Sequence, residues 1–270
     1  MDRSAAANTR FRLAKYMGIL RVSLQTALTY RANIATGLIF YCVYLFVFFN
    51  LWRAIYAGGG VEGLTFQQMI WYLCITELVA SGASVKMDID DQVKTGEIAY
   101  QLIRPYSYIG FQLSSFIGEM LFRLAAFSVL AMLIGFLMVG PIEGFKVWTL
   151  PLSFISVLLG IGISFCSRMA IGLAAFKIEE TRGIFLVYQK LVFMLGIFIP
   201  IEFLPHWLQL IAKNLPFSYV AWAPARLMVG FSWELFAQII SAQLFWFAVT
   251  LGIVILQYCS GVKSIQSQGG

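Results

Sequence analysis

The sequence predicts an all-α integral membrane protein, and two properties of the chain lead to this prediction. Hydrophobic residues make up 60% of the 270 residues and charged residues only 12%, whereas soluble domains usually contain roughly 45–50% apolar residues. The apolar residues also fall in runs about as long as the ~20 residues that cross a bilayer core of about 30 Å. We therefore expect a single transmembrane domain over residues 1–270.

Six apolar segments are long enough to be transmembrane helices. The first and last contain uncharged cores, Ala32–Leu51 and Leu235–Tyr258. Pro151 falls in the first turn of the fourth segment, where its missing N–H costs little. An even number of spans places both termini on one side of the membrane. The expected spans are residues 32–53, 66–86, 112–139, 147–175, 183–201 and 235–258.

The distribution of lysine and arginine indicates which side holds the termini. With a cytoplasmic N-terminus, all but four of the 19 Lys and Arg residues fall in inner segments; the four are Arg53, Lys146, Lys213 and Arg226. Cytoplasmic segments near spans are enriched in these residues, so we expect both termini in the cytoplasm. The formal charge of +6 is dispersed among helix ends. It therefore reflects topology, and we expect no nucleic-acid partner.

Residues 10–30 precede the first span and form an imperfect amphipathic pattern. Basic residues interrupt this stretch, so it is not expected to be a signal peptide. We expect an N-terminal helix in the inner membrane interface, with its cations near lipid headgroups. A cytoplasmic extension of the first span is the alternative. The residues that share the apolar face are Leu13, Met17, Leu20, Leu24 and Leu28.

A proline-rich segment separates the fifth and sixth spans. Each proline removes a backbone donor and disfavours helix at the preceding residue, and the apolar pieces between the prolines are too short to cross a bilayer. Irregular backbone at membrane depth is tolerated only where protein or a water-filled cavity covers it. We therefore expect an outer re-entrant hairpin at residues 200–228. Its prolines are Pro200, Pro205, Pro216 and Pro224.

A charged stretch joins the second and third spans on the cytoplasmic side. Gly96 permits a sharp turn, and the following residues predict a short helix at 97–104 that ends before Pro105. Ile98 and Leu102 mark an apolar face on this helix. A helix this short is marginal alone in water, so a second protein is the simplest cover for that face. A turn lying on lipid is the alternative.

Four elements occur in this order: the basic amphipathic N-terminus, six spans, the segment GEIAYQLIRPYS between spans two and three, and the proline-rich outer segment. In this order the chain resembles the permease subunits of ABC-2-type (type-2 exporter) ATP-binding-cassette transporters. The resemblance covers nearly the whole chain and rests on the order of the elements, because no single motif is as specific as a Walker sequence.

The resemblance implies roles for two of these segments. The loop after the second span forms a coupling helix in a groove of the ATPase subunit, and the outer hairpin helps to form the extracellular gate. The gate residues are then Pro200, Glu202 and Pro205. The residues that couple to the ATPase are Gly96, Glu97, Ile98, Leu102, Arg104 and Pro105.

The resemblance also implies partners and a location. The sequence contains no G-x-x-x-x-G-K-[ST] phosphate loop, so ATP and magnesium are expected on partner ATPase subunits. A second permease, identical or paralogous, is expected to complete the substrate pathway of an exporter in the bacterial cytoplasmic membrane. We expect this chain to bind no cofactor and no metal and to have no catalytic residues: His206 is the only histidine, and the four cysteines show no paired spacing.

Ionisable residues within spans are functional candidates, because burying them costs at least ~2.5–3.5 kcal/mol. Glu77 falls near the middle of the second span, so it either lines the pathway or pairs with a cation across a subunit interface. Glu119 and Arg123 are spaced i, i+4 and are expected to form a structural ion pair. Arg168 is expected to reach the inner interface. Lys190 is expected to do the same or to meet a carboxylate such as Glu179 or Glu180.

Three other classes of protein stay open. An ion-coupled secondary transporter needs a midplane relay, for which Glu77 is the only qualifying residue in the sequence. A membrane enzyme finds little support, because no set of nucleophile, base and orienting residue is evident. A non-transporting assembly subunit would bind partners and move nothing. The uncharged, aromatic spans suit an amphipathic cargo, but the sequence does not define the substrate.

Overall fold

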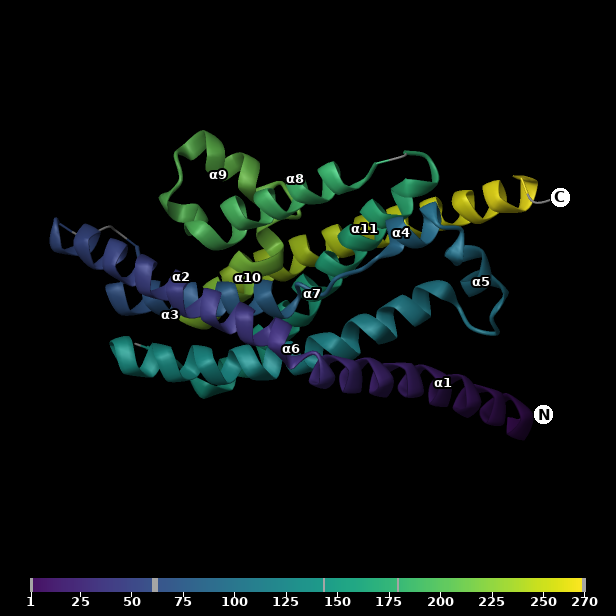
Figure 1. Ribbon diagram of the computed structural model, residues 1–270. Helices are drawn as coiled ribbons and strands as arrows, with labels where there is room; N and C mark the ends of the chain where they lie inside the picture. Colours follow the sequence, from purple (N-terminus) through teal and green to yellow (C-terminus); the bar gives the residue numbers. More distant parts are fainter. Residues whose placement is uncertain (1, 60–62, 143, 179, 269–270) are drawn as a thin grey trace.

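The computed structural model describes residues 2–59, 63–142, 144–178 and 180–268, with side chains described for residues 13–262 except 33 within these ranges. All regular secondary structure in the described ranges is helical, as expected. In Figure 1 the long helices run side by side, and both chain ends lie at the same end of the bundle as α5. The long helices are α1 (Asp2–Thr29), α2 (Arg31–Ala57), α3 (Phe66–Gly82), α6 (Tyr108–Val139), α7 (Leu150–Leu173), α8 (Arg182–Val192), α10 (Ser218–Val229) and α11 (Trp233–Gln268).

Short elements connect the long helices. On the side of the chain ends, α4 and α5 join α3 to α6 (Figure 1). A π-helical turn, η3, extends α8, and η4 and α9 lead from it to α10. The bounds of the short elements are α4 (Ile89–Lys94), α5 (Glu97–Ile103), η1 (Val147–Thr149), η2 (Ala174–Phe176), η3 (Phe193–Phe198), η4 (Ile201–Phe203) and α9 (His206–Lys213).

Four helices among the described residues are long and apolar enough to cross a membrane: Ile34–Ala57, Tyr108–Val139, Val147–Phe176 and Trp233–Val262. They correspond to four of the six expected spans. The other two expected spans fall on shorter helices. With 17 residues, α3 is about 25 Å long, and α8 has 11 residues before the π-helical turn of six.

Several boundaries differ from the expected ones. The first helix begins at Asp2 rather than at residue 10, and α11 continues to Gln268 rather than ending near residue 258. The expected span 66–86 is wrong at its end, because helix α3 stops at Gly82. The low helix propensity of glycine and serine in Ser81–Ser84 accounts for this early end.

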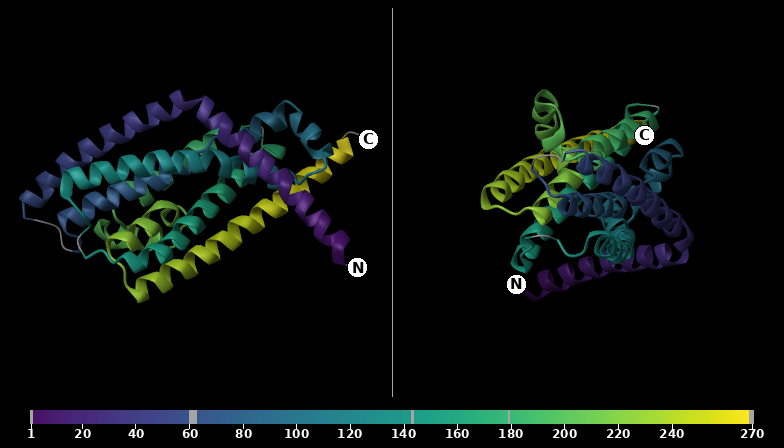
Figure 2. Two further views of the ribbon diagram at one scale, coloured as in Figure 1. Left: turned by 90° about the horizontal axis from the view of Figure 1, so that it is seen from below. Right: turned by 90° about the vertical axis from the view of Figure 1, so that its left-hand side faces the viewer.

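Helix α1 crosses α6 obliquely, and the two helices pack together (Figure 2). Where they cross, a Cβ at Gly118 would meet the backbone carbonyl of Leu20, so a residue without a side chain permits the close approach. The expected apolar face of α1 is only partly turned to the bundle. Leu13, Met17 and Leu28 are exposed and remain the surface for which lipid is the expected cover.

Helices α3 and α10 lie at the centre of the packing. Helix α3 packs against α6 and α10, and α10 also packs against α7, which in turn packs along α11. Every residue of α3 from Met69 to Glu77 is buried. The shorter helix α3 is therefore surrounded by its own chain, whereas α2 and α11 expose long apolar surfaces.

The outer segment contains a helix that passes through a proline. The sequence predicts short pieces limited by Pro216 and Pro224, but α10 runs from Ser218 to Val229 with Pro224 inside it. This expectation was wrong, because α10 continues through Pro224 where it packs between α3 and α7. The Gln243 side chain donates from Nε2 to the carbonyls of Tyr219 and Ser156, each at 3.0 Å.

Candidate functional site

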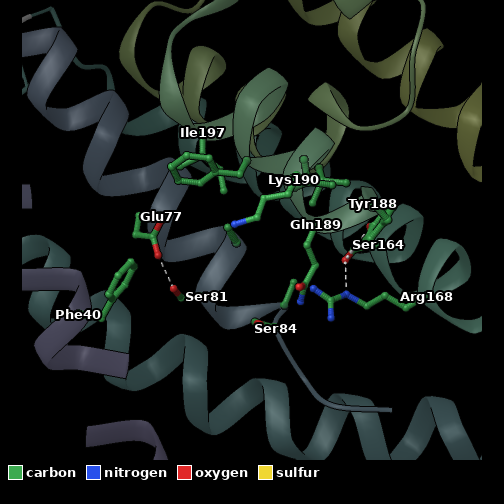
Figure 3. Close-up of a pocket in the computed structure, with 15 residues that line it drawn as sticks. Phe40, Glu77, Ser81, Ser84, Ser164, Arg168, Tyr188, Gln189, Lys190 and Ile197 are labelled. Carbon is green, nitrogen blue, oxygen red and sulfur yellow. Dashed lines mark hydrogen bonds between the residues drawn. The ribbon is translucent and has the colours of Figure 1, made fainter. Parts of the chain in front are cut away.

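A cavity of about 390 Å³ lies between α3, α7 and α8 with its π-helical extension (Figure 3). Its volume falls within the range of small-molecule sites. Phe40 from α2 contributes to its rim, and further apolar residues come from α8, η3 and α10. The polar lining residues are Glu77, Ser81, Ser84, Ser164, Arg168, Tyr188, Gln189 and Lys190.

Glu77 is the carboxylate of this cavity. It belongs to the buried core of α3, with 6% of its surface exposed. The Ser81 hydroxyl, one helical turn later, donates to Glu77 Oε1 at 2.7 Å. Of the three intramembrane residues expected to serve a pathway or an ion pair, Glu77 lines the cavity, whereas Glu119 and Arg123 do not.

Arg168 is held inside the chain by residues of α7 and α8. Its Nε donates to the Ser164 hydroxyl at 3.3 Å. The guanidinium carbon lies 5.3 Å from the ring centre of Phe185 and 5.9 Å from that of Tyr188, within the range of cation–π attraction. Arg168 also borders a second cavity of about 120 Å³ on the side of α4. It therefore lines both cavities.

Lys190 extends from α8 into the cavity, toward the wall that carries Glu77 (Figure 3). Of the alternatives expected for Lys190, the pair with Glu180 does not form, and Glu180 instead forms an exposed ion pair with Lys94 at 3.6 Å. The other expected partner, Glu179, lies outside the described residues. Two cations and one carboxylate from distant parts of the sequence therefore share this cavity.

Glu119 and Arg123 form an ion pair within α6. Arg123 Nη2 lies 2.8 Å from Glu119 Oε1, and Arg123 Nε donates to the same oxygen at 2.8 Å. The i, i+4 spacing on one helix face produces this contact. The pair satisfies both charges locally, within one helix.

Helix α5 begins at Gly96, whose φ of 75° is the left-handed conformation that glycine adopts without strain. The expected apolar face of the helix is partly wrong. Ile98 is buried within this chain, with 2% of its surface exposed, and Leu102 is half-buried. The large apolar residues that remain open are Tyr100, with 73% exposed, and Ile103, with 82% exposed.

Hydrogen bonds fix the end of α5 to the loop that follows it. The Tyr106 hydroxyl donates to Gln101 Oε1 at 3.0 Å, and Arg104 Nη1 donates to the same hydroxyl at 3.0 Å. Gln101 is buried, while Arg104 and Pro105 are exposed. One side of α5 is therefore anchored to its own chain, and the other side presents apolar and basic groups.

The same loop is bound to α1. Lys15 Nζ donates to the carbonyl of Pro105 at 3.3 Å, and the backbone N–H of Ser107 donates to the Tyr16 hydroxyl at 3.1 Å. The loop that connects α5 to α6 is therefore held against α1.

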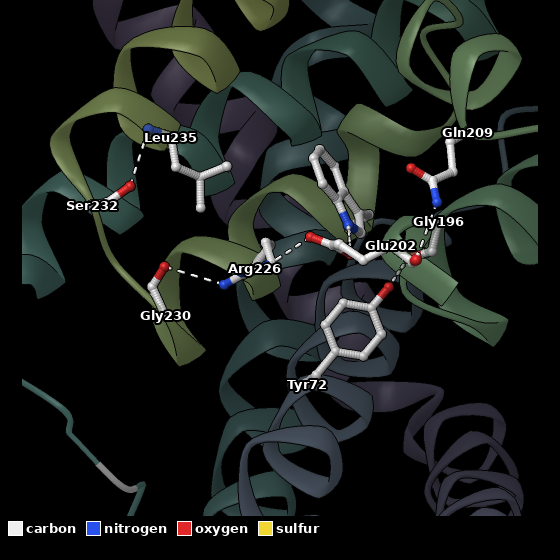
Figure 4. Close-up of polar contacts among 9 residues, drawn as sticks. Tyr72, Gly196, Glu202, Gln209, Arg226, Gly230, Ser232 and Leu235 are labelled. Carbon is white, nitrogen blue, oxygen red and sulfur yellow. Dashed lines mark hydrogen bonds and ion pairs between the residues drawn. The ribbon is translucent and has the colours of Figure 1, made fainter. Parts of the chain in front are cut away.

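The outer segment is organised around Glu202, which lies in η4 between Pro200 and Pro205 (Figure 4). Arg226 Nε donates to Glu202 Oε1 at 2.7 Å, and Trp222 Nε1 donates to Glu202 Oε2 at 3.3 Å. Both donors come from α10. Of the three residues expected at the gate, Glu202 joins the start of the segment to its last helix, and the two prolines precede η4 and α9.

Three further hydrogen bonds hold η3, η4 and α9 in place. Gln209 Nε2 donates to the carbonyls of Glu202 and Leu204, at 3.1 and 2.9 Å. The Tyr72 hydroxyl of α3 donates to the carbonyl of Gly196 in η3 at 3.3 Å (Figure 4). Sequence reasoning missed Arg226 and Trp222 as partners of Glu202, because a separation of 24 and 20 residues leaves no periodic signal.

The fold and these sites define a class: a multi-pass helical membrane protein that has a cavity lined by charged and apolar side chains. It also has a short helix, anchored on one side, at the end of the bundle where the termini lie. A family model described as ABC-2 family transporter protein matches residues 25–269. The chain belongs to this family and is a membrane permease of an ABC transporter. No curated protein matches the chain. Permeases of this family have no ATPase site of their own and associate with an ATP-binding-cassette ATPase.

Proposed function

We propose that this chain is the transmembrane subunit of an ATP-driven exporter. In this proposal it crosses the bacterial cytoplasmic membrane six times, with both termini in the cytoplasm. Helices α3 and α8 are shorter than the four long apolar helices, but both count as spans in this proposal. Other helices surround α3, and η3 extends α8 to the outer side, where η4 and α9 follow. ATP and magnesium bind to partner ATPase subunits, and a second permease, identical or paralogous, completes the pathway.

The exposure of Tyr100 and Ile103 is the observation that carries this proposal. Large apolar side chains are unfavourable in water, and burial in a groove of another protein stabilises them. Exposed Arg104 and Glu97 add polar contacts at the edge of the same surface. We call Glu97, Tyr100, Ile103 and Arg104 the coupling surface.

The anchoring of α5 explains how movement of an ATPase would reach the membrane. Ile98 and Gln101 fix α5 to the bundle, and the bonds of Pro105 and Ser107 fix the following loop to α1. When the ATPase subunits close on ATP, the coupling surface moves with them. The ends of α3, α6 and α1 then move together, and the interface with the second permease opens toward the outside.

Copurification tests this proposal. The tagged chain is isolated from its native membrane, and the copurifying proteins are identified by mass spectrometry. We expect an ATP-binding-cassette ATPase with the wild type and its loss with Ile103→Asp, because a buried carboxylate without a partner is costly. An unchanged yield of ATPase with Ile103→Asp would contradict the assignment of the coupling surface.

The control variant places the same charge close by without removing apolar surface. Thr95 is exposed and precedes α5, so Thr95→Asp should retain the ATPase. Compared in the absence of the ATPase, both variants should elute from size-exclusion chromatography at the volume of the wild type. Aggregation of Ile103→Asp alone would show a folding defect, and Ile103→Ser then serves as the milder variant.

Ion-coupled secondary transport is the second candidate function, and burial of Glu77 beside the cavity favours it. The two candidates differ in proteoliposomes. An exporter moves substrate only when ATP and the ATPase are present, whereas a secondary transporter needs an ion gradient alone. Glu77→Gln would abolish gradient-driven transport, because it removes the only carboxylate among the described residues that line the cavity.

A further inference from the structure

The central cavity combines positive charge with apolar walls. Arg168 and Lys190 face a single carboxylate, Glu77, among the described lining residues, and Phe40 and Phe193 supply aromatic surface. Ionisable side chains at this depth are costly unless they pair or bind. The described residues that line this cavity include two cations and one carboxylate, whereas Asp88, Asp90 and Asp91 line the second cavity that Arg168 also borders.

We propose that this cavity binds an amphipathic anion, with its carboxylate or phosphate group on Arg168 and its apolar body against Phe40 and Phe193. The proposal rests on the transport function proposed above and names the chemical class of the substrate. Phe40 is exposed, so an apolar chain longer than the cavity can leave past α2.

Arg168 is oriented for such a ligand. Its Nε edge is held by Ser164, and the rings of Phe185 and Tyr188 lie against the guanidinium. The Nη edge points into the cavity, toward Gln189 and Ser84 (Figure 3). A guanidinium that is fixed in this way binds planar carboxylate or phosphate oxygens through two parallel hydrogen bonds with little loss of side-chain freedom.

Lys190 is the second cation, and its side chain extends toward the wall of Glu77 (Figure 3). An anion bound in the cavity is attracted to the Lys190 ammonium group and repelled by the Glu77 carboxylate. Lys190 and Glu77 must therefore affect the affinity for the anion in opposite directions. Loss of the Lys190 charge weakens binding, and loss of the Glu77 charge strengthens it.

Binding of dodecyl phosphate to the purified full chain tests this proposal without any ATPase. The chain is placed in phosphatidylcholine nanodiscs, and tritiated dodecyl phosphate is added below its micellar concentration, with empty nanodiscs as the blank. Unlabelled dodecanoate, dodecyltrimethylammonium and dodecyl maltoside compete for the site. These probes share one tail and differ only in the head group.

We expect saturable binding that dodecanoate displaces and dodecyltrimethylammonium does not. Lys190→Gln and Arg168→Gln should each weaken binding about tenfold, the effect of one charged hydrogen bond. Lys190→Arg should retain binding, and Glu77→Gln should tighten it. Lys213→Gln, which changes an exposed lysine outside the cavity, should leave it unchanged.

Three results would overturn the proposal: equal displacement by all head groups, preferential displacement by the cationic probe, or unchanged binding in Lys190→Gln and Arg168→Gln. Lys190 is exposed, so Lys190→Gln is expected to fold even if Arg168→Gln does not. Loss of ATPase copurification in a chain that still binds dodecyl phosphate would refute the proposed transport function alone. The reverse result would refute the ligand class alone.

Discussion

Arg226 Nε lies 2.7 Å from Glu202 Oε1, and this ion pair joins the first turn of the outer segment to its last helix. Both side chains are partly buried, so solvent screens the pair less than it screens a surface pair. The contact holds η4 against α10 at the end of the bundle opposite α5 (Figures 1 and 4).

Glu202→Gln should lower the free energy of unfolding by about 1–3 kcal/mol, because it weakens two hydrogen bonds to a charged group and removes the ionic partner of Arg226. Thermal unfolding of the purified chain in detergent measures this change. Glu234→Gln, at an exposed acidic residue, is the matched control and should have little effect. Equal stability of the two variants would show that the pair contributes nothing.

Gly118→Ala should separate α1 from α6, because the added Cβ meets the backbone carbonyl of Leu20. We expect a loss of about 1–3 kcal/mol, the usual cost of overpacking. Gly18→Ala on α1 is the opposite case. A Cβ there meets nothing within 4 Å, so alanine should stabilise the helix by up to about 1 kcal/mol. Unfolding curves that change in the same direction would contradict this account of the crossing.

Ile98→Ala should mainly lower stability, whereas Ile103→Ala should mainly weaken association with the ATPase. Ile98 is buried, so truncation should cost about 2–5 kcal/mol of stability. Ile103 is exposed, and Ile103→Ala should change stability by less than about 0.5 kcal/mol while reducing the amount of copurified ATPase. Differential scanning fluorimetry and copurification separate the two outcomes. A stable Ile98→Ala chain would disprove the anchoring of α5.

Labelling of introduced cysteines should establish the orientation. Lys146→Cys and Thr95→Cys both change exposed residues and are placed in a chain whose four cysteines are replaced by serine. A membrane-impermeant maleimide should label Lys146→Cys in intact cells, and Thr95→Cys only after permeabilisation. The opposite labelling pattern would place the termini outside.

Gln243→Leu should destabilise the centre of the bundle. It removes the two buried hydrogen bonds that Gln243 donates to the carbonyls of Tyr219 and Ser156, each of which contributes about 0.5–1.5 kcal/mol. Gln238→Leu, at an exposed position of the same helix, is the matched control. The midpoint of thermal unfolding should fall for the first variant only.

Much of the architecture was predictable because lipid requires long apolar helices. The uncharged runs at 32–51 and 235–258 lie within α2 and α11, and Gly96 and Pro105 bracket α5 as local turn chemistry predicts. The family was also predictable, because the order of the elements along the chain indicates it even though no single motif is specific.

It was less predictable which side of each helix is buried and which residues from distant segments lie close together. Helix α5 carries apolar residues on both sides, so periodicity does not distinguish the anchored Ile98 from the open Ile103. Pro224 disfavours a helix on local grounds, but α10 continues through it where it packs against α3 and α7. Glu77, Arg168 and Lys190 line one cavity because of how α3, α7 and α8 pack. No fixed spacing in the sequence indicates this packing.

The burial of α3 has a consequence for biosynthesis. This helix leaves the ribosome before α6 and long before α10, the two helices that cover it. During that interval α3, which is short and contains Glu77, is not expected to insert stably into the membrane by itself. Insertion of α3 must therefore await later parts of the chain, and a nascent chain truncated before α10 should leave α3 open to insertase and quality-control factors.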